Sequence, residues 1–315
     1  SIRRQRQMCI RDRAMIVAPP PDTHARYQLP NLVSRQSAAR VFSRQLPLKR
    51  RMHSFTALSR DQETDLPDHD SLIQRRPDIS TDPLRFPRGA RAGTCLHRIL
   101  ETVDFTAPLQ GPQRTTINQL LRAGGFSEEW GDTVVNLLQR VLATPLDGQR
   151  LADITREQRC DELEFYYPLV SLTADALKTL LAQHGFGNGP LANDWVERLQ
   201  FESAEGYLHG FIDLVFESEG RYFVVDYKSN DLGPRDKDYA PERLLATMVQ
   251  EHYLLQYLIY TLAVHRYLRL RLPDYDYEQH FGGVYYLFLR GMNPASEQSS
   301  GIYFCLLYTS PSPRD

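Results

Sequence analysis

Two neighbouring apolar segments that carry charged residues constrain the fold of this chain most strongly. The segments are residues 210–216 and 221–228, and the turn-forming stretch 217–220 separates them. β-Branched and aromatic residues fill both segments, so the pattern predicts a β-hairpin with a connection of four or five residues. Asp226 and Lys228 then share one face, and Asp213 lies directly across from Asp226 or one diagonal step away.

Two carboxylates at this spacing predict a site for a divalent metal ion. Side chains on opposed strand positions have Cβ atoms roughly 4.5–5.5 Å apart. Asp213 and Asp226 would repel each other at that distance unless a cation lay between them. The alternative is a solvent-facing strand with an ordinary Asp–Lys pair. The apolar residues on either side favour a buried strand, in which isolated charges are costly.

The lysine beside this pair is unusual for the chain. Among 37 basic residues only four are lysines, namely Lys49, Lys178, Lys228 and Lys237. A compact ammonium can approach a phosphate or a metal-bound water, whereas the planar guanidinium of arginine has a different geometry and holds its proton more firmly. The choice of lysine at position 228 therefore favours a catalytic role.

Composition excludes several classes of function. The net charge of −2 and the pI near 6.5 do not indicate a strongly basic nucleic-acid binder, so any contact with a polyanion must be local or shared with a partner. No apolar stretch is long enough to span a membrane, and we find no convincing signal peptide. The cysteines form no C-x-x-C pair, so neither a zinc ribbon nor an iron–sulfur cluster is expected; they are Cys9, Cys95, Cys160 and Cys305. We expect reduced thiols and a cytoplasmic location.

The composition divides the chain into four parts. Residues 1–13 and 305–315 resemble translated sequencing-adaptor sequence, and we interpret both as non-native tails on a protein cut off at each side. Residues 14–92 are rich in Pro, Arg, Asp and Ser and read as a connecting segment, with one short helix near 34–44. Residues 93–304 form the expected folded domain.

Periodicity predicts an α/β domain with a mixed central sheet flanked by helices. Thr94 is the expected N-cap of a helix over 94–103, and two further helices are expected at 114–123 and 127–143. A strand at 162–169, a helix at 173–184 and the hairpin at 206–229 follow. A single long helix over 239–270 and a strand at 281–289 complete the domain.

Several polar residues outside the hairpin are candidates for the same site. His97 lies just off the apolar stripe of its helix, with Glu101 one turn later, although a lone helical histidine is more often structural. Glu164 lies among aromatic residues, and the alternative for it is a surface position on an edge strand. Gln256 and Tyr260 share one helix face, as core-packing residues also would. A basic helix end can bind phosphate or complement the helix dipole; it holds Arg266, Arg269 and Arg271.

These motifs, in this order, closely resemble the C-terminal nuclease domain of RecB-type proteins, the β subunits of exodeoxyribonuclease V. The resemblance covers about residues 40–304, and it rests on an ordered set of motifs rather than on one D-x-K. The motifs are 93–101, Glu164 with Phe165, 210–213, 226–230, Gln256 with Tyr260, and 282–291. Residues 54–59 look like the junction leading out of the helicase region.

The resemblance implies a PD-(D/E)xK restriction-endonuclease-like core and Mg²⁺-dependent cleavage of DNA during double-strand-break repair. One or two Mg²⁺ ions would be held by His97, Asp213 and Asp226, with the Tyr227 carbonyl as a further ligand. Lys228 would orient or help to deprotonate the attacking water, with Asp213 and Asp226 completing the catalytic set. The supporting positions of the family fall on Glu164, Gln256 and Tyr260.

The resemblance also implies partners and leaves alternatives. DNA, RecC-like and RecD-like subunits and the RecA recombinase are the implied partners, in a bacterial cytoplasm and away from membranes. No G-x-x-x-x-G-K-S/T loop is present, so ATP would act only through a helicase portion outside this chain. A non-catalytic docking module for partner subunits or recombinase is the alternative, although such a module should have lost ligands. An iron–sulfur nuclease would need four suitably spaced cysteines, which the chain lacks.

Overall fold

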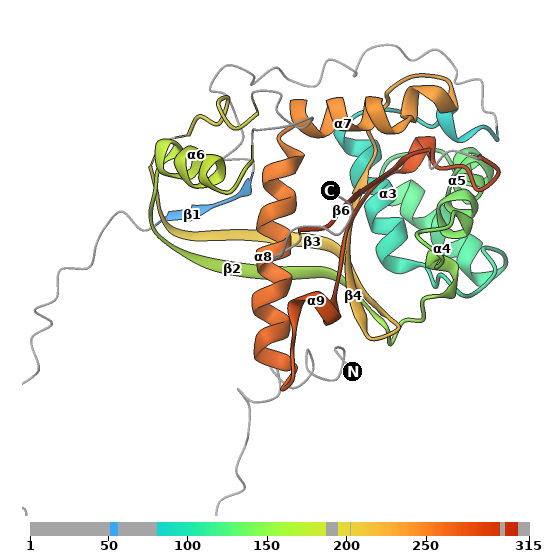
Figure 1. Cartoon of the computed structure of the whole chain (residues 1–315). Helices are drawn as coiled ribbons and strands as arrows, with labels where there is room; N and C mark the ends of the chain where they lie inside the picture. Colours follow the sequence, from blue (N-terminus) through green and yellow to red (C-terminus); the bar gives the residue numbers. More distant parts are fainter. Residues whose placement is uncertain (1–50, 56–80, 187–194, 202, 297–299, 308–315) are drawn as a thin grey trace, which may run out of the picture.

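A computed structural model of the chain describes residues 51–55, 81–186, 195–201, 203–296 and 300–307 (Figure 1). Its centre is a six-stranded mixed sheet. Five strands follow the order β1-β3-β4-β5-β6, and β2 pairs with the other edge of β3. The strands are β1 Arg51–His53, β2 Arg159–Leu172, β3 Ala204–Ser218, β4 Arg221–Lys228, β5 Phe281–Phe288 and β6 Ile302–Cys305. The expected α/β class with a mixed sheet is confirmed.

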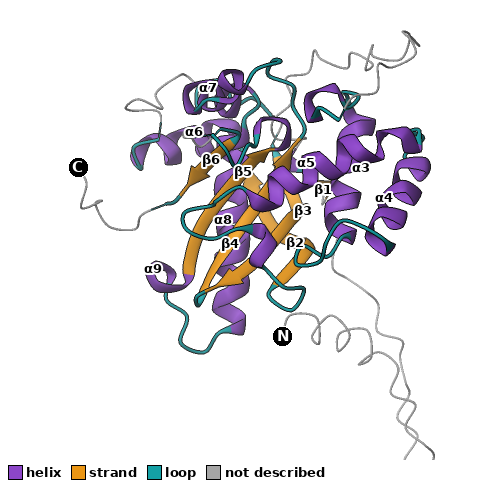
Figure 2. Ribbon diagram, turned by 90° about the vertical axis from the view of Figure 1, so that its right-hand side faces the viewer, coloured by secondary structure: helices purple, strands orange, loops and turns teal. Residues whose placement is uncertain are grey.

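Helices cover both faces of this sheet. The α-helices are α3 Ala90–Thr102, α4 Pro112–Ala123, α5 Gly131–Ala143, α6 Ala174–Gln183, α7 Pro241–Gln250, α8 Tyr253–Arg271 and the single turn α9 Tyr277–His280. Short 3₁₀ segments are η2 Pro83–Arg85, η3 Glu128–Trp130, η4 Leu151–Asp153, η5 Asp236–Tyr239 and η6 Leu289–Gly291. Figures 1 and 2 place α8 against one face and α3, α4 and α5 against the other.

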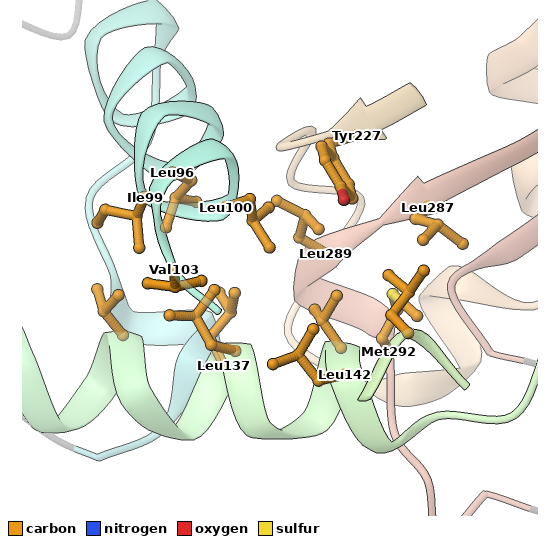
Figure 3. Packing of buried hydrophobic residues seen from close by; sticks show 14 of the residues in the cluster. Leu96, Ile99, Leu100, Val103, Leu137, Leu142, Tyr227, Leu287, Leu289 and Met292 are labelled. Atoms are coloured by element: carbon orange, nitrogen blue, oxygen red, sulfur yellow. The ribbon is translucent and has the colours of Figure 1, made fainter. Parts of the chain in front are cut away.

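Alternation along the hairpin strands creates two separate cores. On β4, Val224 packs with α7 and α8, whereas Val225 packs with α3, α4 and α5. Figure 3 shows the second core, in which Tyr227 lies beside apolar side chains of α3, α5 and β5. The strand is thus covered on both faces, which explains its nearly continuous apolar sequence. It follows that Asp226 and Lys228, which alternate with Tyr227, face the side of α8.

The turn of the hairpin is tighter than expected. β3 and β4 pair as far as Ser218 and Arg221, so only Glu219 and Gly220 connect them. Both turn residues have positive φ, 50° and 78°, as a two-residue hairpin turn of the primed type requires. The register pairs Leu214 with Val225. Continued by one residue, it places Asp213 directly opposite Asp226, the first of the two positions that the sequence allowed.

The expected helix over 239–270 is wrong as one element. It is divided into α7 and α8, because His252 adopts the left-handed conformation with φ 56° and interrupts the helical path. Figure 1 shows the two helices running in different directions across the molecule. The break has a local consequence for the site, because it makes Tyr253 the first residue of α8.

The other helices agree with the sequence except at their starts. α3 begins at Ala90 rather than Thr94, and its N-cap is Gly89 with φ 94°. The Thr94 hydroxyl donates instead to the Ala90 carbonyl within the helix. The expected helix at 127–143 begins with η3, which the Ser127 hydroxyl caps, before α5. α4 and α6 lie where they were expected.

Some sequence-based expectations concern residues outside the described ranges. These are the N-terminal tail, most of the C-terminal tail (308–315), the short helix near 34–44 and most of the connecting segment, including residues 56–59 of the expected junction. The described part of that segment contributes β1, which runs parallel to β3, and the buried Phe86. β6, which the sequence did not predict, ends at Cys305 and pairs with β5. Among the described helices, none combines the length and apolar character that crossing a membrane needs.

Candidate active site

The sheet opens at the two aspartates. β2 occupies one edge of β3, while β1 pairs with the start of the opposite edge at 206–208 and β4 with its end at 214–218. Beyond Val225, β4 continues along β5 alone. The N–H of Tyr227 therefore has no strand partner on the β3 side, and it donates instead to Oδ2 of Asp213 at 2.8 Å. This bond satisfies a buried backbone donor and fixes the Asp213 carboxylate in the opening between β3 and β4, which we call the fork.

Helix α3 approaches the fork closely because it carries a glycine. A Cβ on Gly93 would lie 2.6 Å from the Ser229 hydroxyl oxygen, so only glycine fits there without a shift. His97 lies one turn later on the same helix face, and its Nδ1 is 3.4 Å from Oδ1 of Asp213. Burial lowers the pKa of His97, but the hydrogen bond and charge of Asp213 outweigh burial, so the pKa lies above its ordinary value.

A second contact holds the end of β4 against the segment that precedes α3. The buried guanidinium of Arg290 donates to the Ser229 carbonyl at 3.0 Å and to the Phe86 carbonyl at 2.8 Å. The rigid guanidinium group of Arg290 thus links the two backbone segments on either side of the site. This link joins the end of β4, which carries Asp226, to the segment that leads into the helix of His97.

Asp226 and Lys228 form a buried ion pair. Nζ of Lys228 lies 2.6 Å from Oδ2 of Asp226, and the two side chains are 10% and 4% exposed. Burial raises the pKa of Asp226 to about 6, and the charge of Lys228 opposes the increase. Burial, the largest single influence, lowers the pKa of Lys228, but the charge and hydrogen bond of Asp226 together with the neighbouring Tyr253 and Asp213 outweigh burial, so this pKa is raised. The lysine therefore stays an ammonium near neutral pH.

The ammonium is anchored from α8 as well. Lys228 donates to Oε1 of Gln256 at 3.1 Å, and the Gln256 amide donates to the Tyr260 hydroxyl at 2.9 Å. The Tyr260 hydroxyl in turn donates to the Phe211 carbonyl on β3 at 2.9 Å. The expected one-turn spacing of Gln256 and Tyr260 thus forms a chain of hydrogen bonds from the lysine back to the strand that carries Asp213.

Glu164 is not in this network. Its Oε1 accepts a hydrogen bond from the Tyr166 hydroxyl at 2.6 Å and lies 3.0 Å from Nε2 of His209. The side chain is 44% exposed. The structure therefore places Glu164 on the open part of β2, as the surface alternative described, and does not bring it to Asp213 or Lys228.

A different glutamate on β2 lies nearer the aspartates. The register of β2 and β3 places Glu162 opposite Asp213, and Glu162 has a left-handed backbone with φ 52°. Burial raises its pKa, and the charges of Asp213 and Glu101 add to the increase. Glu164 rather than Glu162 was expected at the site, because Glu164 falls on a supporting position of the family that the chain resembles. The register with Asp213 is the signal that could have found Glu162.

The Tyr227 side chain and the basic helix end make contacts with neighbouring rings. The Tyr227 side chain is buried in the core shown in Figure 3, and its ring meets that of His97 edge-on at 5.9 Å. Arg266 lies over the Tyr167 ring, and Arg271 over the Tyr267 ring. These contacts attach two of the three arginines to neighbouring aromatic side chains.

The protein ligands alone do not form a closed metal cage. Within the described residues, no three His, Cys, Asp or Glu side chains are arranged so that they could hold a metal ion. His97 contacts Asp213, whereas Asp226 is turned toward Lys228. The arrangement instead combines two carboxylates, one imidazole and one ammonium at the opening of a sheet. Such a set can bind a cation and act on an anionic, hydrolysable group.

Comparison with known families agrees with this chemistry. The profile of the PD-(D/E)XK nuclease superfamily matches residues 72–301, which is most of the chain. The chain belongs to the PD-(D/E)XK nuclease superfamily. Nucleases of this superfamily generally use divalent metal ions.

The resemblance to RecB is confirmed by relatives of this PD-(D/E)XK chain. The RecBCD enzyme subunit RecB of Escherichia coli is 44% identical over 224 residues, which cover 70% of the chain. The corresponding subunit of Haemophilus influenzae is 41% identical over 226 residues, again 70% of the chain, and that of Mycobacterium tuberculosis is 35% identical over 239 residues, or 68%. The chain spans 18% of the length of the first two relatives and 22% of the third.

Proposed function

We propose that this chain is a Mg²⁺-dependent DNA nuclease module of a RecBCD-type helicase–nuclease, of the exodeoxyribonuclease V type. The observation that carries the proposal is the buried ammonium of Lys228 beside Asp226 at the fork where Asp213 and His97 meet. A buried lysine is costly to retain for stability alone. Its position next to two opposed carboxylates suits the hydrolysis of a phosphodiester.

The residues fit a divalent cation by their chemistry. Asp213 and Asp226 supply carboxylate oxygens, and His97 supplies an imidazole nitrogen, with the Tyr227 carbonyl as a further proposed ligand. Oδ2 of Asp226 is buried and makes no hydrogen bond of good geometry, although Lys228 lies beside it. An under-satisfied buried carboxylate oxygen is the kind of atom that a cation would satisfy. When bound, Mg²⁺ would polarise the phosphodiester and activate water.

The side chains would divide the remaining work. Lys228 would hold the attacking water or offset the charge that builds on the phosphate in the transition state. Gln256 would fix the direction of the ammonium, and Tyr260 would fix Gln256. Asp213, held by the Tyr227 N–H, would keep its orientation through the reaction. Glu162 would add negative charge beside Asp213 and so strengthen the attraction for a cation.

The relatives suggest the setting of this activity. Their names assign them to the RecBCD enzyme, so we propose RecC-like and RecD-like subunits, DNA and the RecA recombinase as partners, with a role in recombinational repair in the bacterial cytoplasm. ATP would act through a helicase portion outside this chain. Because the net charge is −2, we expect the 315-residue chain alone to cleave DNA weakly and with low processivity.

Removal of the metal should abolish the activity. We expect the chain to degrade linear single- and double-stranded DNA with Mg²⁺, to stop when EDTA is added in excess, and to recover when Mg²⁺ is restored. The assay follows release of acid-soluble nucleotides at matched ionic strength, with the full RecBCD-type complex as a reference. Cleavage that continues undiminished in EDTA would contradict the proposal.

The affinity for a metal ion should rise with pH, because the pKa values of Asp226 and His97, two proposed ligands, are raised. Asp226, with its pKa near 6, and His97, with its raised pKa, must lose their protons before a cation binds. Affinity for Mn²⁺ should therefore rise from pH 5 to pH 7, by up to about tenfold per unit for each proton released. Calorimetric titrations in buffers of different ionisation enthalpy measure both quantities. An affinity that is constant over this range would contradict the assignment.

A further inference from the structure

The face of the Tyr253 ring lies directly against the Lys228 ammonium. Nζ of Lys228 is 3.5 Å from the centroid of the Tyr253 ring, closer than its 5.4 Å to the Tyr286 ring. Asp226 and Gln256 supply its polar contacts. A ring face this close attracts an ammonium through its quadrupole, and the attraction grows when water is excluded.

Three contacts hold Tyr253 in place. It stacks on Tyr286 at 5.9 Å between centroids, with 15° between the ring planes. The Tyr286 hydroxyl donates to the Tyr253 carbonyl at 3.1 Å, and the Tyr253 hydroxyl donates to Oδ1 of Asn230 at 3.5 Å. Tyr286 is the β5 partner of Asp226. Tyr253 is thus fixed to β5, the strand that pairs with β4, and to Asn230 just beyond the end of β4, the strand that carries the ion pair.

The helix break explains why a tyrosine reaches this place. His252 turns the chain in the left-handed conformation, so α8 starts at Tyr253 and its first turn faces the end of β4. Gln256 lies three residues later on the same turn. One helical turn therefore contributes both the ring under the ammonium and the amide beside it.

We propose that Tyr253 is a positioning residue that directs the Lys228 ammonium through its ring face. The proposal rests on the nuclease function above and names a residue that acts through Lys228 rather than on DNA. Burial raises the pKa of Tyr253, so its phenol stays neutral near pH 7. The ring, not the hydroxyl, then makes the contact, and phenylalanine should replace it.

The kinetic test compares three substitutions. Tyr253→Leu should lower kcat for DNA cleavage roughly five- to thirtyfold with little change in KM, since a desolvated cation–π contact has about that effect. Tyr253→Phe should keep the wild-type rate within about twofold. Tyr267→Leu is the matched control, because Tyr267 faces Arg271 in a similar pair on the same helix. Wild-type kcat in Tyr253→Leu, or equal losses in the Phe and Leu variants, would overturn the proposal.

A second readout needs no cleavage. The chain has four lysines, so lysine-specific ¹³C labelling gives few side-chain signals. The ring current of Tyr253 should shift the Lys228 ε-methylene upfield in the wild type and in Tyr253→Phe, but not in Tyr253→Leu. Absence of such a shift in the wild type would overturn the positioning role even if cleavage is normal. A normal shift in a wild type that does not cleave DNA would instead reject the nuclease function.

Discussion

Replacing Lys228 with alanine is expected to lower the rate of DNA cleavage by about 10²–10⁴-fold with little change in DNA affinity. The ammonium is the one side-chain cation that the described structure places against Asp226. Proton transfer or charge stabilisation by one positioned group contributes about this much to a rate. Single-turnover cleavage of end-labelled DNA in saturating Mg²⁺ measures the chemical step directly.

A matched lysine controls for loss of charge in general. Lys178 lies on α6, at the opposite end of the sheet from α3 in Figure 1, and Lys178→Ala should cleave DNA like the wild type. Lys228→Ala should keep its affinity for Mn²⁺, because Lys228 is not a proposed ligand. If both lysine variants cleave DNA equally well, Lys228 has no part in catalysis.

Asp226→Ala is expected to abolish cleavage, with a loss of at least about a thousandfold, since both the metal and the activated water depend on it. Mn²⁺ binding should weaken together with the rate. The variant should remain folded but less stable, because it leaves a buried ammonium without its carboxylate. Losing one partner of a buried pair costs about 3–5 kcal/mol, and this is an upper limit here because Gln256 and Tyr253 still contact Lys228.

Asp226→Asn separates chemistry from stability. It keeps the size of the side chain and should also lose cleavage, while urea titration reports the free energy of unfolding. Asp153→Ala is the control, because Asp153 makes an exposed ion pair with Arg150 far from any proposed ligand in sequence.

Combining Asp226→Ala with Lys228→Ala should lower the rate little further, because groups that act as one unit are not additive. Full cleavage by Asp226→Ala would remove this residue from the site.

The strands β2 to β5 and the shared face of the hairpin residues could be predicted from sequence because their cause is local, whereas β1 and β6 were not predicted. Alternation put Lys228 on the same face as Asp226, and it left two positions for Asp213, between which the two-residue turn of the structure decides. The one-turn spacing of Gln256 and Tyr260 predicted a shared face, and the structure adds the hydrogen bond between them. These features follow from the periods of strand and helix.

The features that the sequence did not predict depend on backbone conformations and long-range contacts. His252 in the left-handed conformation has no distinct sequence signal in a stretch that otherwise favours helix, so the division into α7 and α8 was missed. The contact of Tyr253 with Lys228 depends on that break. Glu164, rather than Glu162, was expected at the site because it falls on a supporting motif position of the family, and the left-handed backbone of Glu162 is not predicted by strand alternation.

Crystals of the wild-type protein grown with Mn²⁺ test whether His97, Asp213 and Asp226 bind one metal ion beside Lys228. We expect an anomalous difference peak in the fork, within roughly 2.0–2.5 Å of a His97 ring nitrogen and of carboxylate oxygens of Asp213 and Asp226. Lys228 should remain beside this peak without binding the metal ion. Crystals saturated with Mn²⁺ that show no peak at the fork, or a peak that neither aspartate contacts, would contradict this expectation.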